Sequence, residues 1–280
     1  MKRCIRTLAW FMCSSCLLTM GAVAKTPAQY SFSVVPQYDV AKLHKDWTPL
    51  LRRIEHETGI TLVLKISASI ERFETEIAAG GSDFAYMNPY HAVIGRKSQA
   101  YVPLLRDKTP LTGVLTTRLD GPYKSVQDLD GQVIGFPSPN AFAASLYMRA
   151  LLSEKEKLRF EPRYLTNHSN VLRNVARHTV AAGGSVSSAF NDELPELHGQ
   201  LRVVYRTPEV ASHPIVVHPR VPVAVRNAVA RTVLELAGEE AGRIMLKQIR
   251  IPQPVLANYA RDYAQLEKLT LQKYMVKTTE

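Results

Sequence analysis

The residue types best suited to binding a small molecule stand directly after predicted strands. Tyr38 follows the first strand, in a loop where Asp39 is placed to cap the next helix. Tyr90 follows a short buried strand, where the chain leaves the sheet. A tyrosine in such a loop offers a ring that packs on a ligand and a hydroxyl that hydrogen-bonds to it. We expect Tyr38 and Tyr90 to contact a ligand, Tyr86 to belong to the core, and His91 to be a solvated residue at a helix start.

A run of small residues and prolines at 135–144 is the second candidate. Its two prolines exclude a helix or a central strand there, and Asn140 or Ser138 can cap the helix that follows. A helix start without bulky side chains exposes free N–H groups and the positive end of the helix dipole, which together bind anions. A plain capped helix is the alternative interpretation. The residues of this candidate anion site are Asn140, Ala141, Phe142 and Ala143.

His168 is the third candidate, because it stands in the loop 166–170 before another predicted helix, with Ser169 or Asn170 as the cap. An imidazole there can donate a hydrogen bond to an anion, although a lone histidine is also a common structural residue. The other histidines have no partners at the spacing of a zinc site, and the chain has no glycine-rich phosphate loop and no G-x-S-x-G motif. We therefore predict a binding protein with no catalytic residue, metal or cofactor.

These loops belong to an alternation of strands and helices that runs through the chain twice. Apolar residues recur at helical spacing from Trp47 to Ile54 and stop at Gly59, whereas short apolar runs without that period indicate strands. Two successive α/β units predict two lobes, each a mostly parallel sheet flanked by helices, with a ligand cleft between them. The predicted strands are 30–35, 60–66, 84–87, 111–117, 132–136, 163–165, 181–188, 201–205 and 215–217.

The composition is that of an ordinary globular protein, with 46% hydrophobic and 21% charged residues among 280. The formal net charge is +10, of which Lys2, Arg3 and Arg6 supply three. The remaining +7 is spread along the chain without a basic block, which argues against nucleic acid as a partner.

The first 24 residues have the pattern of a signal peptide. A basic start is followed by an apolar run too short to span a bilayer and by a small-x-small cleavage site at 22–24. All three cysteines, Cys4, Cys13 and Cys16, lie in that segment, so the mature chain is expected to have no thiol and no disulfide. We expect a periplasmic protein, and a lipid anchor at Cys16 is the less favoured alternative.

The order of these elements and motifs resembles the phosphate/phosphite/phosphonate-binding proteins of ABC transporters, a family of exported two-lobed solute receptors. The residues that carry the resemblance are Asp83-Phe-Ala-Tyr-Met-Asn-Pro-Tyr90, Leu129-Asp-Gly-Gln-Val-Ile-Gly-Phe136, Ser138-Pro139, His168 and the stretch 207–217. The resemblance implies the two-lobed periplasmic-binding-protein fold of type II, with a small oxyanion held between the lobes. By position, Tyr90 and His168 match ligand-binding residues of the family, and Tyr38 matches one less closely.

The chain departs from the family at one ligand contact. The family's Ser-Thr-Ser run, which holds the oxyanion, falls here on Ala141-Phe-Ala143, so three hydroxyl donors are missing. Each such hydrogen bond to a charged ligand contributes roughly 1.5–3 kcal/mol. We therefore favour a ligand with an organic part or a less demanding anion.

The expected domain organisation follows from the same resemblance. A signal peptide at 1–24 precedes lobe 1, which consists of 25–109 and 213–280, and lobe 2 consists of 110–212. The two connections between the lobes serve as a hinge, which lets the cleft close on a ligand.

We expect a monomeric periplasmic solute-binding protein that captures a small oxyanion or an organophosphonate-like ligand for an ABC permease. Two alternatives stay open. The same fold can report a ligand to a membrane sensor kinase, and a periplasmic hydrolase could use His168 with Asp192 or Glu193.

Overall fold

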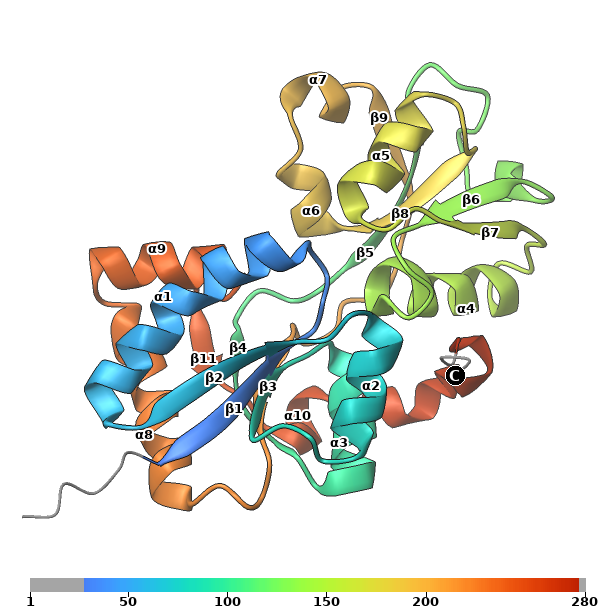
Figure 1. Cartoon of the computed structure of the whole chain (residues 1–280). Coiled ribbons are helices and arrows are strands. Elements are labelled where there is room, and N and C mark those ends of the chain that lie inside the picture. Colours follow the sequence, from blue (N-terminus) through green and yellow to red (C-terminus); the bar gives the residue numbers. More distant parts are fainter. Residues whose placement is uncertain (1–27, 277–280) are drawn as a thin grey trace, which may run out of the picture.

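The computed structural model describes residues 28–276. The predicted signal peptide, its cleavage site and Cys16 lie outside the described residues. Eleven strands in this range form two separate sheets, one of six strands in the order β11-β4-β10-β3-β1-β2 and one of five in the order β7-β6-β8-β5-β9. Figure 1 shows them as two lobes, and the chain crosses between them after β4 and again after β9.

The first lobe contains the six-stranded sheet and the N-terminal end of the described chain (Figure 1). Its strands are β1 (Gln29–Val34), β2 (Thr61–Ile66), β3 (Phe84–Tyr86), β4 (Val102–Asp107), β10 (Pro214–Val217) and β11 (Pro254–Leu256). Its helices are α1 (Val40–Thr58), α2 (Ile70–Ala78), α3 (Pro89–Gln99), α8 (Val223–Leu236), α9 (Glu240–Gln248) and α10 (Tyr259–Asp262), followed by the short helices η3 (Ala264–Leu269) and η4 (Leu271–Tyr274).

The second lobe contains the five-stranded sheet. Its strands are β5 (Gly113–Arg118), β6 (Val133–Phe136), β7 (Glu161–Tyr164), β8 (Ala182–Val186) and β9 (Leu201–Arg206). Its helices are η1 (Gln127–Leu129), η2 (Phe142–Leu146), α4 (Tyr147–Glu154), α5 (His168–Ala176), α6 (Ser187–Asn191) and α7 (Pro195–His198). None of the helices within residues 28–276 combines the length and the apolar character that a membrane crossing requires.

The helix α1 shows how closely local sequence sets the element limits. The Asp39 side chain accepts a hydrogen bond from the Lys42 N–H at 2.8 Å, which confirms the predicted cap. Leu50 and Ile54 are fully buried on one face of the helix. Gly59 ends the helix with φ of 67°, a left-handed conformation that glycine adopts without steric cost.

The prediction of mostly parallel sheets is wrong in detail, because both sheets are mixed. In the first sheet β1 pairs with β2 and β3 in parallel, whereas β10 runs antiparallel to β3 and β4, and β11 antiparallel to β4. In the second sheet β6 is parallel to β7 and β8, and β5 is antiparallel to β8 and β9. The cause is the route of the chain, since β10 returns from the second lobe and inserts between β3 and β4.

The two connections between the lobes lie side by side. Leu111, on the outward connection, forms an isolated antiparallel bridge with Val210, on the return connection. The Leu111 N–H donates to the Val210 carbonyl at 2.8 Å, and the Val210 N–H donates back at 3.1 Å. The Ser212 hydroxyl of the return connection also donates to the Asp107 carbonyl at the end of β4, at 2.8 Å. Two short connections that lie together in this way have the arrangement of a hinge between lobes.

Strand β4 was not predicted, because Pro103 argues against a strand with neighbours on both sides. The structure accommodates it at an irregularity. Pro103 lies opposite Val216, where the register between β4 and β10 shifts, so the missing N–H is placed at a local break in the ladder.

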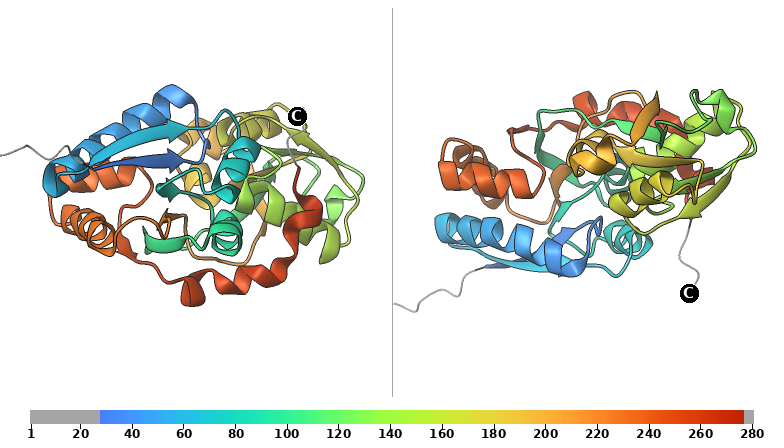
Figure 2. Two further views of the ribbon diagram at one scale, coloured as in Figure 1. Left: turned by 60° about the horizontal axis from the view of Figure 1, so that its bottom comes forward. Right: turned by 90° about the horizontal axis from the view of Figure 1, so that it is seen from above.

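The C-terminal segment from α10 onward runs from the first lobe to the second (Figures 1 and 2). Lys273 forms an ion pair with Glu154 of α4 at 2.6 Å, and the Tyr274 carbonyl accepts a hydrogen bond from Arg149 at 2.8 Å. Its end therefore packs on a helix of the opposite lobe and joins the two halves of the molecule.

Candidate functional site

Three hollows meet at His168, between the lobes. The inner hollow, of about 290 Å³, is lined by Tyr38, Tyr86 and His213 of the first lobe and by Val186 and Asp192 of the second, among others. The outer and lateral hollows, of about 380 and 360 Å³, are also lined by His168. Together the three hollows form a cleft between the two lobes, which is a usual position for a ligand site.

His168 is a neutral hydrogen-bonding group in this cleft. The side chain is 8% exposed, and its Nδ1 lies 3.1 Å from the Ser185 hydroxyl of β8. Burial, and then the positive charge of Arg250, lower the pKa of His168 to about 4. Within residues 28–276, Nε2 makes no hydrogen bond to protein, so this nitrogen is available to a ligand.

The N-cap of helix α5 lies two or three residues earlier than predicted. Asn167, and not Ser169 or Asn170, is the N-cap residue, and its side chain accepts the Asn170 N–H at 2.8 Å. His168 is therefore the first residue of the helix. Its ring is directed back toward β8 and the cleft and is held there by Ser185.

His213 forms a second neutral group on the opposite wall. Its Nε2 lies 2.8 Å from Gln37 Nε2, and its ring stacks on Tyr86 at 5.5 Å. Burial, and to a smaller extent the neighbouring His91 and His168, lower the pKa of His213 to about 3. Tyr86 is 6% exposed, so the prediction that it belongs to the core is confirmed, although it also lines the inner hollow.

Arg250 brings a permanent positive charge to the cleft. It lines both the inner and the outer hollow. Its guanidinium lies over the Tyr38 ring, 5.9 Å from the centroid, and forms an ion pair with Asp192 of the second lobe. Lys247, from the end of α9, adds a second cation to the inner hollow. Sequence reasoning missed both residues.

The stretch 140–143 has a different structure from the one predicted. Ala141 is the N-cap of η2, a π-helix, and no side chain caps it, so the prediction of Asn140 or Ser138 as the cap is wrong. Phe142 is 2% exposed. Its ring stacks on Tyr90 of the first lobe, with centroids 6.1 Å apart and planes 2° apart. This segment therefore makes a dry apolar contact between the lobes.

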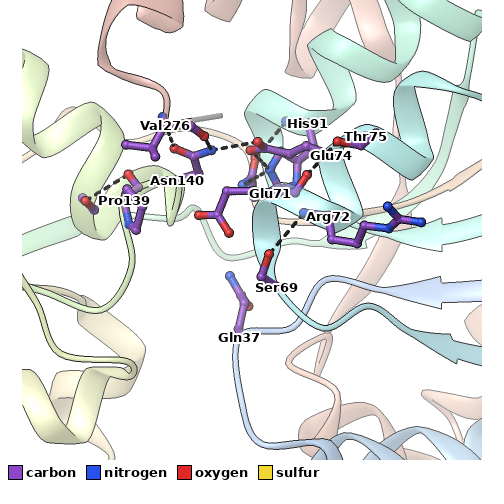
Figure 3. A network of polar contacts seen from close by, with 12 residues as sticks. Gln37, Ser69, Glu71, Arg72, Glu74, Thr75, His91, Pro139, Asn140 and Val276 are labelled. Carbon is purple, nitrogen blue, oxygen red and sulfur yellow. Dashed lines mark hydrogen bonds and ion pairs between the residues drawn. The ribbon is translucent and has the colours of Figure 1, made fainter. Parts of the chain in front are cut away.

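The Asn140 side chain joins three elements that are distant in sequence (Figure 3). Its Nδ2 donates to Glu74 Oε2 of α2 and to the Val276 carbonyl, both at 2.8 Å, and its Oδ1 accepts the Val276 N–H at 2.9 Å. The other oxygen of Glu74 lies 2.8 Å from His91 Nε2. His91 is 1% exposed, so the prediction of a solvated residue is wrong, because its ring is paired with this buried carboxylate.

The lateral hollow is acidic. It is lined by Glu71, Ser69, Ser138 and Ala141, with His168 at the point shared with the other hollows. Figure 3 shows the Glu71 carboxylate reaching from α2 toward the turn at Pro139. With Glu74 also bound at Asn140, negative charge lies beside the predicted anion site.

The structure brings only some of the predicted ligand residues to these hollows. Tyr38 and His168 line the inner and outer hollows together, and Ala141 and His168 line the lateral one. The remaining predicted residues line none of the three and lie in the contact between the lobes. They are Tyr90, Asn140, Phe142 and Ala143, whose ligand contacts stay a prediction.

Two α/β lobes, joined by a pair of connections and separated by a cleft, define a bilobal solute-binding protein. The sequence identifies the particular family. A sequence profile of the family described as "ABC transporter, phosphonate, periplasmic substrate-binding protein" matches residues 32–263. The chain belongs to this family, whose members are periplasmic substrate-binding proteins and not enzymes.

Solved structures with the same fold include two phosphonate-related proteins. PhnD1 from Prochlorococcus marinus, in complex with methylphosphonate, is 12% identical with a TM-score of 0.78, over 89% of this chain and 100% of that one. A binding protein component of an ABC phosphonate transporter from Pseudomonas aeruginosa is 13% identical with a TM-score of 0.75, over 89% and 88%.

A third similar structure has a different ligand. A protein from Xanthomonas citri bound to ATP is 15% identical with a TM-score of 0.73, over 88% of this chain and 98% of that one. At these identities the likeness extends to the fold alone. No curated protein sequence matches the chain significantly, and the comparisons support neither the sensor-kinase nor the hydrolase alternative.

Proposed function

We propose that the cleft at His168 binds a small organic anion, of organophosphonate-like character, and that the protein delivers it to an ABC permease. The observation that carries the proposal is the convergence of three hollows on one buried, neutral histidine, with the permanent charge of Arg250 beside it. A neutral imidazole and a fixed cation suit an anionic group, because neither requires proton uptake to bind it.

The two lobes are assigned to residues 25–109 with 213–280 and to residues 110–212. Support for these limits comes from the sheet memberships, since β4 and β10 belong to one sheet and β5 and β9 to the other. The hinge is then formed by the connections that Leu111 and Val210 bridge. In this proposal the protein acts as a monomer, and ligand contacts from both lobes favour the closed form that the permease recognises.

Isothermal titration calorimetry of the mature protein tests the ligand class. Methylphosphonate, phenylphosphonate, phosphite, phosphate and chloride are titrated separately. We expect heat of binding for at least one phosphonate and a weaker response or none for chloride. If none of these anions binds at millimolar concentration, the proposed ligand class is refuted.

The His168→Leu variant tests the location of the site. It removes the hydrogen bond from the cleft while roughly preserving volume, so we expect the affinity to fall about 10- to 100-fold. His56→Leu is the matched control, because the His56 side chain is 81% exposed on α1, outside the three hollows. Equal affinities of the two variants would place the site elsewhere.

A further inference from the structure

Arg250 stands at a backbone position that normally requires glycine. It follows the C-cap residue Ile249 of α9 with φ of 67°. The Arg250 N–H donates to the Lys247 carbonyl at 3.2 Å, and the Ile251 N–H donates to the Leu246 carbonyl at 2.8 Å. This pair of bonds is a Schellman motif, whose left-handed residue is usually glycine because a side chain is disfavoured there.

The neighbours of Arg250 hold this conformation in place. Ile251 and Leu246 are fully buried, and Ile249 is 2% exposed. The arginine between them therefore cannot relax into an ordinary conformation without moving core residues. A disfavoured residue that its surroundings force into place is a reason to look for a function of its side chain.

The side chain of Arg250 leaves this position into the cleft. It lies over the Tyr38 ring and lines the inner and outer hollows, and its partner across the cleft is the carboxylate of Asp192. The Asp192 side chain is 55% exposed and that of Arg250 is 38% exposed. An ion pair this accessible to water is weak, so another anion can displace its carboxylate.

The charges around the cleft favour the inner hollow as the site of an anion. Arg250 and Lys247 both line the inner hollow. The other carboxylate there, Asp107, is 4% exposed and already accepts the Thr109 and Gln253 N–H groups, each at 2.7 Å. The lateral hollow, in contrast, holds Glu71 without a cation in its lining.

The inner hollow also has room for an apolar group. Its walls include two aromatic rings and several aliphatic side chains, and its volume is about 290 Å³. Such walls gain free energy by covering apolar surface of a ligand. The apolar lining residues include Tyr38, Tyr86, Leu111, Val186 and Pro252.

We propose that Arg250 binds the anionic head of the ligand in place of Asp192, and that the apolar walls of the inner hollow bind its body. Asp192 is then an internal competitor that occupies the guanidinium until ligand arrives. The ligand class is an organic phosphonate or carboxylate whose apolar substituent is up to about the size of a phenyl ring. This inference rests on the proposed function and adds the residue that selects the ligand.

Opposite effects of the two partners test the inference. With phenylphosphonate as the probe in calorimetry, we expect Arg250→Gly to weaken binding about 10- to 100-fold, because a charged hydrogen-bonding partner is lost. Asp192→Asn should leave the affinity unchanged or raise it several-fold, because the competing charge is gone. If both variants weaken binding alike, the pair is only a contact that closes the cleft, and the inference is refuted.

Folding does not obscure this test. Glycine adopts the left-handed conformation freely, so Arg250→Gly should keep or raise the midpoint of thermal unfolding. Arg250→Gln and Arg96→Gln form a matched pair, because the Arg96 guanidinium also lies over a tyrosine ring, that of Tyr259 at 5.6 Å, but lines none of the three hollows. Only Arg250→Gln should weaken binding, and equal affinities of the pair would overturn the inference.

Three further outcomes test the apolar part of the inference and separate the inference from the proposed function. Phenylphosphonate should bind at least about 10-fold more tightly than methylphosphonate, because its ring covers the apolar walls; equal affinities would refute the apolar part. If wild-type protein binds phosphonates but Arg250→Gly binds them equally well, the proposed function stands and the inference fails. If the wild type binds no anion, both fail.

Discussion

Phe142 is predicted to be a main support of the contact between the lobes. Its ring is 2% exposed and lies between Tyr90, at 6.1 Å, and Tyr147, at 5.7 Å, with nearly parallel planes. Replacing a buried phenylalanine by alanine costs about 3–5 kcal/mol, through lost burial and the cavity that remains. Because an ordinary domain is stable by only about 5–15 kcal/mol, Phe142→Ala should remove a large part of the unfolding free energy.

The variant should also loosen the lobes, because Tyr90 belongs to one and Phe142 to the other. Urea unfolding measures the loss of stability, and small-angle X-ray scattering measures the radius of gyration. Phe136→Ala is the matched control, since Phe136 is fully buried in β6 within the second lobe. It should lose similar stability without an increase in radius. Indistinguishable scattering from the two variants would refute the assigned role of Phe142.

Three more predictions concern stability. The unfolded chain protonates His168 near pH 6.5, whereas the folded chain protonates it only near its lowered pKa of about 4. The unfolding free energy should therefore fall by roughly 3 kcal/mol as the pH is lowered from 6.5 to 4. Urea titrations should show a smaller fall for His168→Leu, and the same fall in both proteins would contradict the lowered pKa. The Asn140→Ala variant loses three hydrogen bonds to Glu74 and Val276, which should lower the unfolding free energy by about 2–4 kcal/mol. Carboxypeptidase should then trim its C-terminus faster, and trimming at the wild-type rate would contradict the role of Asn140 in holding this segment. Gly184→Ala would place a Cβ 2.1 Å from the Ala144 carbonyl oxygen and should cost about 3 kcal/mol or more by thermal unfolding, whereas a neutral result would show that η2 is displaced.

Elements set by local sequence were predicted well. The predicted helix that stops at Gly59 is observed as α1 (Val40–Thr58), and the predicted strand at 60–66 is β2 (Thr61–Ile66). Caps, apolar periodicity and terminal glycines act within a few residues, so they can be recognised in the local sequence. Local sequence does not set the order of strands in the sheets, because that order depends on where the chain returns from the second lobe.

The π-helix η2 could not be predicted from residues 140–146 alone. An added Cβ at Gly113 would lie 2.2 Å from the Ala143 carbonyl oxygen, and one at Gly184 would lie 2.1 Å from that of Ala144. The two glycines therefore let β5 and β8 approach the helix backbone closely. They are distant in sequence, so the local pattern of small residues gave no sign that this helix start is buried.

Half of the candidate site was accessible to sequence reasoning. Tyr38 and His168 were predicted because each follows a strand and adjoins a helix cap. Arg250 was missed, although a local signal exists. A helix with its last polar residues at Lys247 and Gln248 is followed by Ile-Arg-Ile-Pro252 with no glycine, and an arginine where a helix-ending glycine is usual deserves inspection as a candidate ligand contact.

The crossing of the C-terminal segment has a consequence for incomplete chains. A polypeptide that stops before residue 264 still contains every strand of both described sheets. It lacks Tyr274 and Val276, which hold Arg149 and Asn140 of the other lobe. Such a product of early termination would keep the contacts of Asn140 with Glu74 and of Phe142 with Tyr90 but lose the tie that the C-terminal segment adds. The apolar surface that Leu266 and Leu271 of this segment cover would be exposed and would make the product a substrate for quality-control proteases.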